Sequence, residues 1–193
     1  RGVPNYLNQI VVSPDGRRAW LPSKKDNIVR GQFRDGKALE HDKSVRSIIS
    51  QIDLSTGSEL FSEQIDFNDR APARAVTFSP QGDYVFVVQM ESNKVEIIDA
   101  YTGSVVGAMN NTGAAPQGVF LDESRKRLYV QNFLSRSVAA YDVADVLRSV
   151  SFAPTKLGVT TTVANENLEA SVLRGKKVFY NAADLRMSKD GYI

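Results

Sequence analysis

Hydrophobic and polar residues alternate in short runs along most of this chain, which is the pattern of β-strands with one buried face. The runs are rich in valine, isoleucine, phenylalanine and tyrosine, and glycine, proline, asparagine or aspartate separates each from the next. The clearest runs are residues 18–21, 84–88, 95–99, 127–130 and 138–142. The pattern therefore predicts a protein built mainly from short strands.

The runs belong to a unit that occurs three times, beginning near Pro4, Pro72 and Pro116. Each copy has a first strand, a tight turn, a Tyr-Val-type or Trp-Leu strand, a polar turn, and a third strand that ends in aspartate. The second and third copies lie about 44 residues apart, and the first contains about 24 extra residues. The repeat predicts three similar four-stranded meanders.

The turns of the repeat have residues suited to their geometry. Ser-Pro-Asp-Gly and Ser-Pro-Gln-Gly sequences end at Gly16 and Gly82, where glycine permits a positive φ. Asp53 and Asp99 each precede a Thr-Gly pair and can accept hydrogen bonds from turn N–H groups. These turns favour hairpins between successive strands.

One such sheet cannot bury both of its faces, and radial stacking of similar sheets solves this; a period of about 40–45 residues is typical of a β-propeller blade. We therefore expect an all-β fold: about three four-stranded blades, at about residues 4–67, 72–110 and 116–164, in an incomplete ring, followed by a C-terminal α-helix. Three blades cannot close a ring. We expect either the C-terminal part of a propeller whose earlier blades are missing, or a ring completed by other copies, with self-association through open blade edges.

After residue 164 the spacing changes from that of strands to that of a helix. Asn165 is a suitable N-cap, acidic residues follow it and basic residues come later, which suits the helix dipole. Helical spacing places four residues on one face: Leu168, Val172, Gly175 and Phe179. We expect this face to pack on the propeller.

Residues 4–145 carry Pro-x-Gly-hydrophobic, Ser-Pro-Asp-Gly, Tyr-Val and Asp-x-x-Thr-Gly motifs, and with these the chain resembles the YVTN family of bacterial β-propeller repeats. That resemblance implies a toroid of seven or eight blades. The Trp-Asp repeat family has a similar period, but its Gly-His and Trp-Asp pairs are absent, since Trp20 and His41 stand elsewhere.

Residues 173–193 resemble the lead-in to a c-type cytochrome module of the di-haem cytochrome c peroxidase kind, through a Gly-x-x-hydrophobic-Phe helix followed by Arg-Met-Ser and Asp-Gly. The resemblance implies that residues 165–193 start a truncated cytochrome c-like domain, that haem c is bound in the full-length parent, and that the parent is periplasmic or on the bacterial cell surface. The Cys-x-x-Cys-His haem motif is not in this chain, so no cofactor is expected in this fragment and no haem-ligating residue is carried over.

Composition narrows the classes of function. The 193 residues carry 24 Lys+Arg and 22 Asp+Glu, a net charge of +2, which gives no support for nucleic-acid binding. No apolar run approaches the roughly 20 residues of a membrane span. The chain has no cysteine, which excludes disulfides and thiolate nucleophiles or metal ligands within it.

The extra residues of the first unit, 28–46, form the candidate partner-contact surface, because long loops in compact folds are often functional. Its candidate residues are Arg30, Phe33, Arg34, His41 and Arg46. The alternative is a solvated hairpin extension of one blade. His41 stands next to Asp42, but no nucleophile motif accompanies them, so a catalytic role has little support. No residues stand at metal-ligand spacing.

These observations favour a binding and scaffold module of a periplasmic or cell-surface protein, contacting a protein partner or a following cytochrome-like domain. Three alternatives remain: an accessory part of a haem peroxidase or oxidoreductase, a surface-layer or adhesion protein, and a lactonase-like hydrolase. The hydrolase needs acids or metal ligands at the central channel, whereas the inner strands offer Gln9, Arg74 and Gln117.

Overall fold

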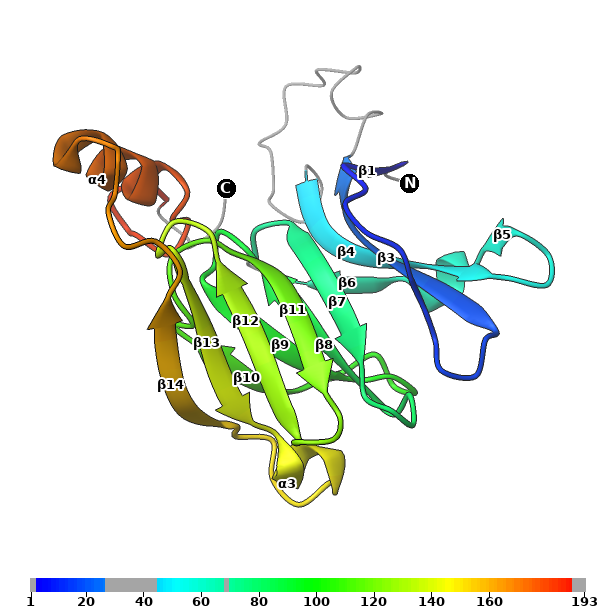
Figure 1. Cartoon of the computed structure of the whole chain (residues 1–193). Helices are drawn as coiled ribbons and strands as arrows, with labels where there is room; N and C mark the ends of the chain where they lie inside the picture. The colour runs from blue at the N-terminus through cyan, green and yellow to red at the C-terminus, as the bar shows by residue number, and fades with distance from the viewer. Residues whose placement is uncertain (1–2, 27–44, 68–69, 189–193) are drawn as a thin grey trace, which may run out of the picture.

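The computed structural model describes residues 3–26, 45–67 and 70–188. Three antiparallel sheets follow one another along the chain and fan out side by side (Figure 1). In the second sheet four strands form a meander, and in the third four more do the same. The second sheet contains β7 (Ala73–Phe78), β8 (Tyr84–Gln89), β9 (Lys94–Asp99) and β10 (Val105–Asn110), and the third contains β11 (Pro116–Asp122), β12 (Arg127–Asn132), β13 (Ser137–Asp142) and β14 (Thr155–Thr161).

The first sheet has the same plan with both edges interrupted. Its centre is a long hairpin, in which every residue of one strand pairs with a residue of the other from Arg18↔Asp53 to Asp26↔Val45. Two short strands pair with each side of this hairpin, so that each pair occupies one edge position. The strands are β1 (Val3–Asn5), β2 (Val11–Val12), β3 (Arg18–Asp26), β4 (Val45–Asp53), β5 (Ser58–Glu59) and β6 (Ile65–Phe67), with a 3₁₀ turn, η1 (Phe61–Glu63), between the last two.

The structure thus confirms the predicted fold: β-propeller blades, about three in number and four-stranded, in an incomplete ring with a C-terminal helix. The predicted turns are also present. Gly16 and Gly82 have φ of 70° and 79°. The Asp53 carboxylate accepts from Ser55 N at 2.8 Å, and the Asp99 carboxylate accepts from Tyr101 N at 2.9 Å.

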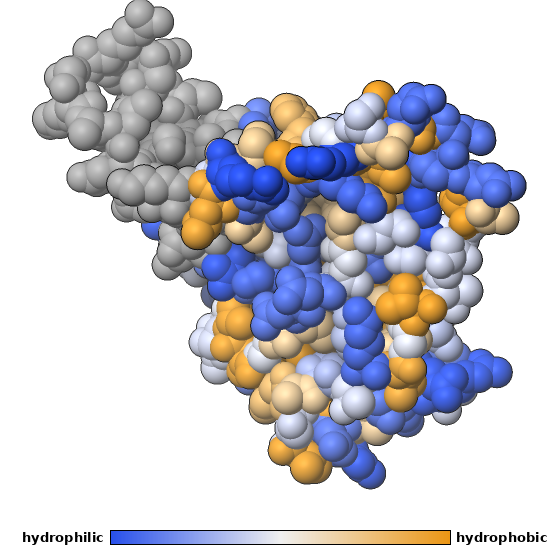
Figure 2. All heavy atoms as spheres, turned by 90° about the vertical axis from the view of Figure 1, so that its left-hand side faces the viewer, coloured by the Kyte–Doolittle hydropathy of each residue, from blue (hydrophilic) through white to orange (hydrophobic). Residues whose placement is uncertain are grey.

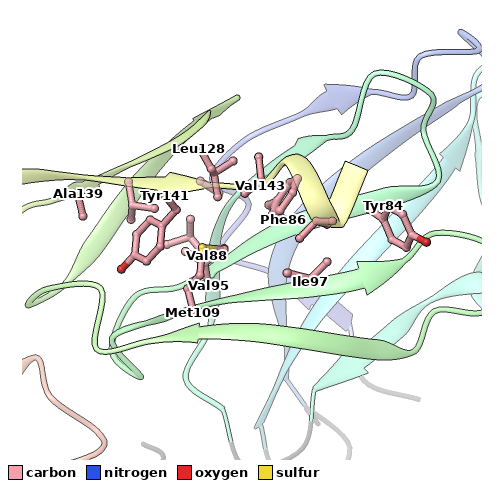
Figure 3. Close-up of a cluster of buried hydrophobic side chains, with 13 residues drawn as sticks. Tyr84, Phe86, Val88, Val95, Ile97, Met109, Leu128, Ala139, Tyr141 and Val143 are labelled. Carbon is pink, nitrogen blue, oxygen red and sulfur yellow. The ribbon is translucent and has the colours of Figure 1, made fainter. Parts of the chain in front are cut away.

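Apolar side chains fill the space between neighbouring sheets. Between the second and third sheets, Phe86, Ile97 and Leu128 are fully buried in one cluster (Figure 3). Between the first and second sheets, Trp20 and Phe78 meet edge to face, with ring centroids 5.2 Å apart. Successive blades are therefore held together by side chains that alternate along each strand.

The C-terminal residues differ from expectation in two ways. The helix α4 spans Ala170–Phe179, with Glu169 at the N-cap position but, within the described residues, without a capping hydrogen bond involving its side chain, so the prediction of Asn165 as the N-cap is wrong. None of the helix residues is buried, so the expected packing of its apolar stripe on the propeller is also wrong. A short helix that was not predicted, α3 (Ala144–Leu147), precedes the outer strand β14, all of whose residues are exposed.

Figure 2 views the molecule from the side on which β14 and α4 lie. Hydrophobic residues appear on this face as separate patches between polar ones. Exposed apolar side chains in this part of the chain include Phe120, Leu157 and Val159, which are 64%, 49% and 53% exposed. The solvent-exposed surface of the third blade therefore carries both apolar and polar side chains.

Candidate functional site

The inner strands of the blades begin at one end of the propeller axis, and their first side chains meet there. Arg74 in β7 donates through Nη1 to the amide oxygen of Asn8. The side-chain oxygen of Gln9 accepts from Val76 N at 2.7 Å, which ties the first blade to the inner strand of the second. Gln117 in β11 approaches the Met90 sulfur at 3.7 Å. We call this end of the molecule the axial end.

A cavity of about 380 Å³ lies at the axial end. Asn8, Arg74 and Gln117 are among its lining residues, whereas Gln9 is not. Two cationic side chains, Lys24 and Arg74, and one carboxylate, Glu91, line the cavity. Three aromatic rings also line it: Tyr6, Phe133 and Tyr180. The cavity therefore combines charge of both signs with apolar walls.

The charged residues of the cavity have different surroundings. Lys24 Nζ lies 5.9 Å from the centre of the Tyr6 ring, a cation–π distance. Glu91 is half-buried, and this burial raises the pKa of its carboxyl. Among the described residues, no side chain forms a hydrogen bond or ion pair with the Glu91 carboxylate. The Glu91 carboxylate therefore lines the cavity without a partner among the described residues.

The C-terminal segment is fastened to the same end of the molecule. Asn93, in the turn between β8 and β9, donates through Nδ2 to Asn181 Oδ1 at 2.8 Å. Beside it, Ala182 N donates to the Glu91 carbonyl at 2.9 Å, and Ala182 is fully buried. The Asn93 side chain also accepts from Ala115 N at 2.9 Å. We call the contacts of Asn181 and Ala182 with this turn the C-terminal anchor.

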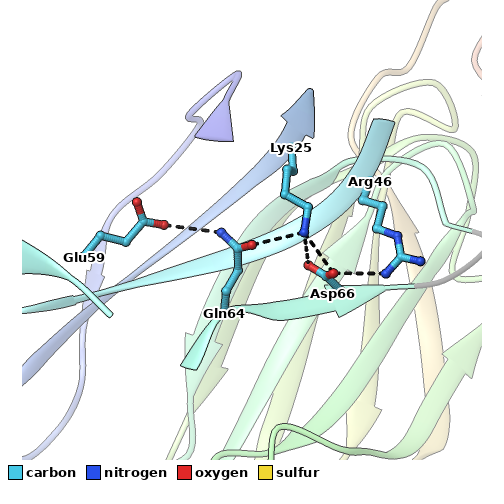
Figure 4. Close-up of polar contacts among 5 residues, drawn as sticks. All are labelled: Lys25, Arg46, Glu59, Gln64 and Asp66. Carbon is cyan, nitrogen blue, oxygen red and sulfur yellow. Dashed lines mark hydrogen bonds and ion pairs between the residues drawn. The ribbon is translucent and has the colours of Figure 1, made fainter. Parts of the chain in front are cut away.

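Four of the five predicted contact residues, Arg30, Phe33, Arg34 and His41, lie outside the described residues. Arg46 does not belong to a loop, because β4 begins at Val45 and includes it. Its Nη1 pairs with Asp66 at 3.0 Å, and Lys25 Nζ reaches the same carboxylate at 3.0 Å (Figure 4). Arg46 therefore takes part in an ion pair within the first blade, and its role in partner contact stays a prediction.

The sequence contained a signal for several of the cavity residues. In an antiparallel meander, the turn after the second strand lies at the end where the first strand began. Lys24 lies near the end of the second strand of the first blade, and Glu91 lies in the turn after the second strand of the second blade, so both reach the axial end. Tyr6, Phe133 and Tyr180 could be placed only by the structure.

The described part of the chain contains neither a cluster of metal ligands nor a membrane-spanning helix. Residues 3–26, 45–67 and 70–188 contain no cluster of three or more His, Cys, Asp or Glu side chains that could bind a metal ion. No helix within these ranges is long and apolar enough to cross a bilayer.

Four-stranded sheets arranged around an axis define the protein as a β-propeller, and solved structures agree. The chain is similar to hydrazine synthase of Kuenenia stuttgartiensis, with a TM-score of 0.61 and 16% identity over 73% of this chain and 46% of that one. A putative 6-phosphogluconolactonase from Bacteroides uniformis matches with a TM-score of 0.58 and 18% identity, over 88% of this chain and 46% of that one.

The WD40 repeats of RRP9 match with a TM-score of 0.57 and 16% identity, over 83% of this chain and 40% of that one. The chain thus spans less than half the length of these structures, and at such identities the likeness shows the fold alone. No family model matches the sequence, and no curated protein matches it.

Proposed function

We propose that this chain is a binding and scaffold module, in which the blades hold the C-terminal segment, and whatever it joins or contacts, in a fixed position at the axial end. The observation that carries the proposal is the C-terminal anchor. Asn181 and Ala182 are bound to a turn of the second blade, although the connection before the helix is attached to the third. The segment therefore returns across the axial end of the molecule.

The path of the segment supports rigid presentation. After β14, Glu166 accepts from Arg136 Nε at 3.0 Å, which fixes the connection on the third blade. The helix α4 follows with no buried residue, and the chain is then fastened again at Ala182. Attachment on both sides limits the positions that α4 can take, because each attachment removes conformational freedom from the segment between them.

The finer identity that we propose follows the two sequence resemblances. The blades are YVTN-type repeats of a periplasmic or cell-surface bacterial protein, and residues 165–193 lead into a c-type cytochrome domain that the propeller orients. A visible absorption spectrum of the natural gene product tests this part. A Soret band supports it, and peroxide reduction by the same protein would assign the propeller as an accessory part of a haem oxidoreductase. Without a Soret band the cytochrome proposal fails.

The scaffold proposal can be tested with this chain alone, because it has no cysteine and two spin labels can be placed without ambiguity. We choose Glu123→Cys in an exposed turn of the third blade and Lys177→Cys on α4, both exposed. A double electron–electron resonance experiment should give one narrow distance distribution.

Asn181→Ala removes the acceptor for Asn93 and should broaden that distribution. It should also speed amide exchange at Ala182 by about fivefold, as expected for losing about 1 kcal/mol of hydrogen bonding. Asn167→Ala, which lies in the exposed connection before α4, is the matched control and should change neither measurement. A broad distribution in the unmodified protein would contradict rigid presentation.

A further inference from the structure

The cavity at the axial end contains opposite charges that the protein does not pair with each other. Arg74 and Glu91 both line it, yet no ion pair joins them. The one hydrogen bond that the Arg74 guanidinium forms within the described residues is donated to the neutral amide of Asn8. An arginine has five N–H donors arranged for a planar carboxylate, so most of this group's capacity is unused.

Glu91 lacks a hydrogen-bond donor for its carboxylate among the described residues, as Arg74 lacks a carboxylate. The Glu91 carboxylate is half-buried, and burial of an unpaired charge is unfavourable. The raised pKa of the Glu91 carboxyl is the consequence of this burial. An ammonium group entering the cavity would pair with Glu91 and favour its ionised form.

The remaining walls suit a compact apolar body. Tyr6, Phe133 and Tyr180 contribute rings, and Pro72 and Met90 add further apolar surface. The volume of about 380 Å³ lies at the lower end of the range of about 300–1,000 Å³ for small-molecule sites. The cavity is therefore of a size for one small molecule.

We propose that this cavity binds a small zwitterion, such as a free L-amino acid with an apolar side chain, whose carboxylate pairs with Arg74 and whose ammonium group pairs with Glu91. The aromatic residues surround its side chain. This activity goes beyond the scaffold function, although the C-terminal anchor helps to place Tyr180 in the cavity wall. The same two groups occur at the ends of a short peptide, where they are further apart.

Isothermal titration calorimetry with L-phenylalanine and three derivatives separates these possibilities. Phenylalaninamide lacks the carboxylate, N-acetylphenylalanine lacks the ammonium group, and glycylphenylalanine has both groups separated by a peptide bond. We expect phenylalanine to bind at least about tenfold more tightly than the amide or the acetyl derivative, since each loses one charged contact. Tighter binding of the dipeptide would identify a peptide end as the source of the two groups.

Two variants test the assigned contacts. In Arg74→Gln, phenylalanine and its amide should bind equally, and in Glu91→Gln, phenylalanine and its acetyl derivative should bind equally. Arg127→Gln and Glu123→Gln change the same residue types at exposed positions outside the cavity and should leave all affinities unchanged. Each variant is tested by comparing two ligands on that variant. A variant that binds all ligands more weakly would therefore still show the difference between them if the substituted residue did not make the assigned contact.

The proposal is wrong if none of the standard amino acids binds at about 10 mM, a concentration that detects even weak sites. It is also wrong if the amide and acetyl derivatives bind the unmodified protein as well as phenylalanine does. Neither result would affect the spin-label test, so failure of this proposal is distinguishable from failure of the scaffold function.

Discussion

The two interfaces between neighbouring blades differ in how they accommodate polar groups. Between the second and third blades, apolar side chains dominate, and the rings of Tyr84 and Phe152 meet edge to face with centroids 5.1 Å apart. Between the first and second blades, a chain of buried polar groups accompanies the apolar cluster. Ser47, Gln89 and Glu96 form this chain, and each is at most 1% exposed.

The buried polar chain is specific in its partners. Ser47 Oγ donates to Gln89 Oε1 at 3.1 Å and accepts from Ala73 N at 2.9 Å. Glu96 pairs with Arg70 Nε at 2.7 Å. Directed hydrogen bonds of this kind require one register, whereas apolar contacts are not directional. We infer that the apolar clusters supply most of the stability of both interfaces. The buried polar groups favour one way of packing the first blade against the second.

The largest effect should come from the apolar interface. Phe86→Ala removes a fully buried ring and should lower the free energy of unfolding by about 3–5 kcal/mol. Phe120→Ala, at a position that is 64% exposed, is the control and should change it by less than about 0.5 kcal/mol. Urea unfolding measures both. If both substitutions lowered the free energy of unfolding equally, the apolar interface would not be a main source of stability.

A smaller effect should come from breaking the polar interface on one side. Arg70→Met leaves the Glu96 carboxylate buried without its ion-pair partner and should cost about 2–3 kcal/mol, toward the low end for a buried pair because the Arg70 side chain is 31% exposed.

The double variant Arg70→Met, Glu96→Gln removes the buried charge while keeping a polar group beside Gln89. It should recover more than half of the loss in urea unfolding, because most of the cost is the uncompensated charge. If the double variant is less stable than Arg70→Met, the polar chain contributes stability itself, and the division of roles between the two interfaces is wrong.

The smallest effect should come from the polar atom in the apolar interface. Tyr141 is 3% exposed, and within the described residues its hydroxyl has no hydrogen-bond partner. Tyr141→Phe should therefore raise the free energy of unfolding by up to about 1 kcal/mol, since an unsatisfied buried hydroxyl is unfavourable. Thermal unfolding compares the variant with the parent, and a clear loss of stability would show that the hydroxyl has a partner in solution.

The sheets could be predicted because the sequence of each turn is sufficient to determine its geometry. Gly82 and Asp99 show this, since one requires a positive φ and the other accepts N–H groups two residues away. Boundaries set by long-range contacts could not be predicted in this way. β4 begins at Val45, inside the extra segment 28–46, because its pairing with β3 continues to Asp26, a contact between distant residues.

The helix boundary shows the same limit. Asn165 has the right chemistry for an N-cap. However, the side chain of the next residue, Glu166, accepts from Leu168 N at 3.0 Å and from Arg136 at 3.0 Å. These bonds hold the connection outside the helix, which starts after Glu169. A tertiary contact thus determines where the helix begins.

The candidate site was predictable in part. Arg74 and Gln117 were expected on inner strands, and both line the cavity. Glu91 stands in a polar turn, and polar residues are common in turns, so nothing in the sequence singles it out. Tyr180 could not be foreseen, because its position depends on the return of the C-terminal segment to the second blade.

Tyr180 belongs to two features at once: it forms part of the cavity wall, and it is the C-cap residue directly after α4. A molecule in the cavity and a force on α4 therefore act on the same side chain. Any coupling between ligand binding and the position of α4 has the same free energy in both directions. The C-terminal segment therefore contributes both to the wall of the cavity and to the anchor on the second blade.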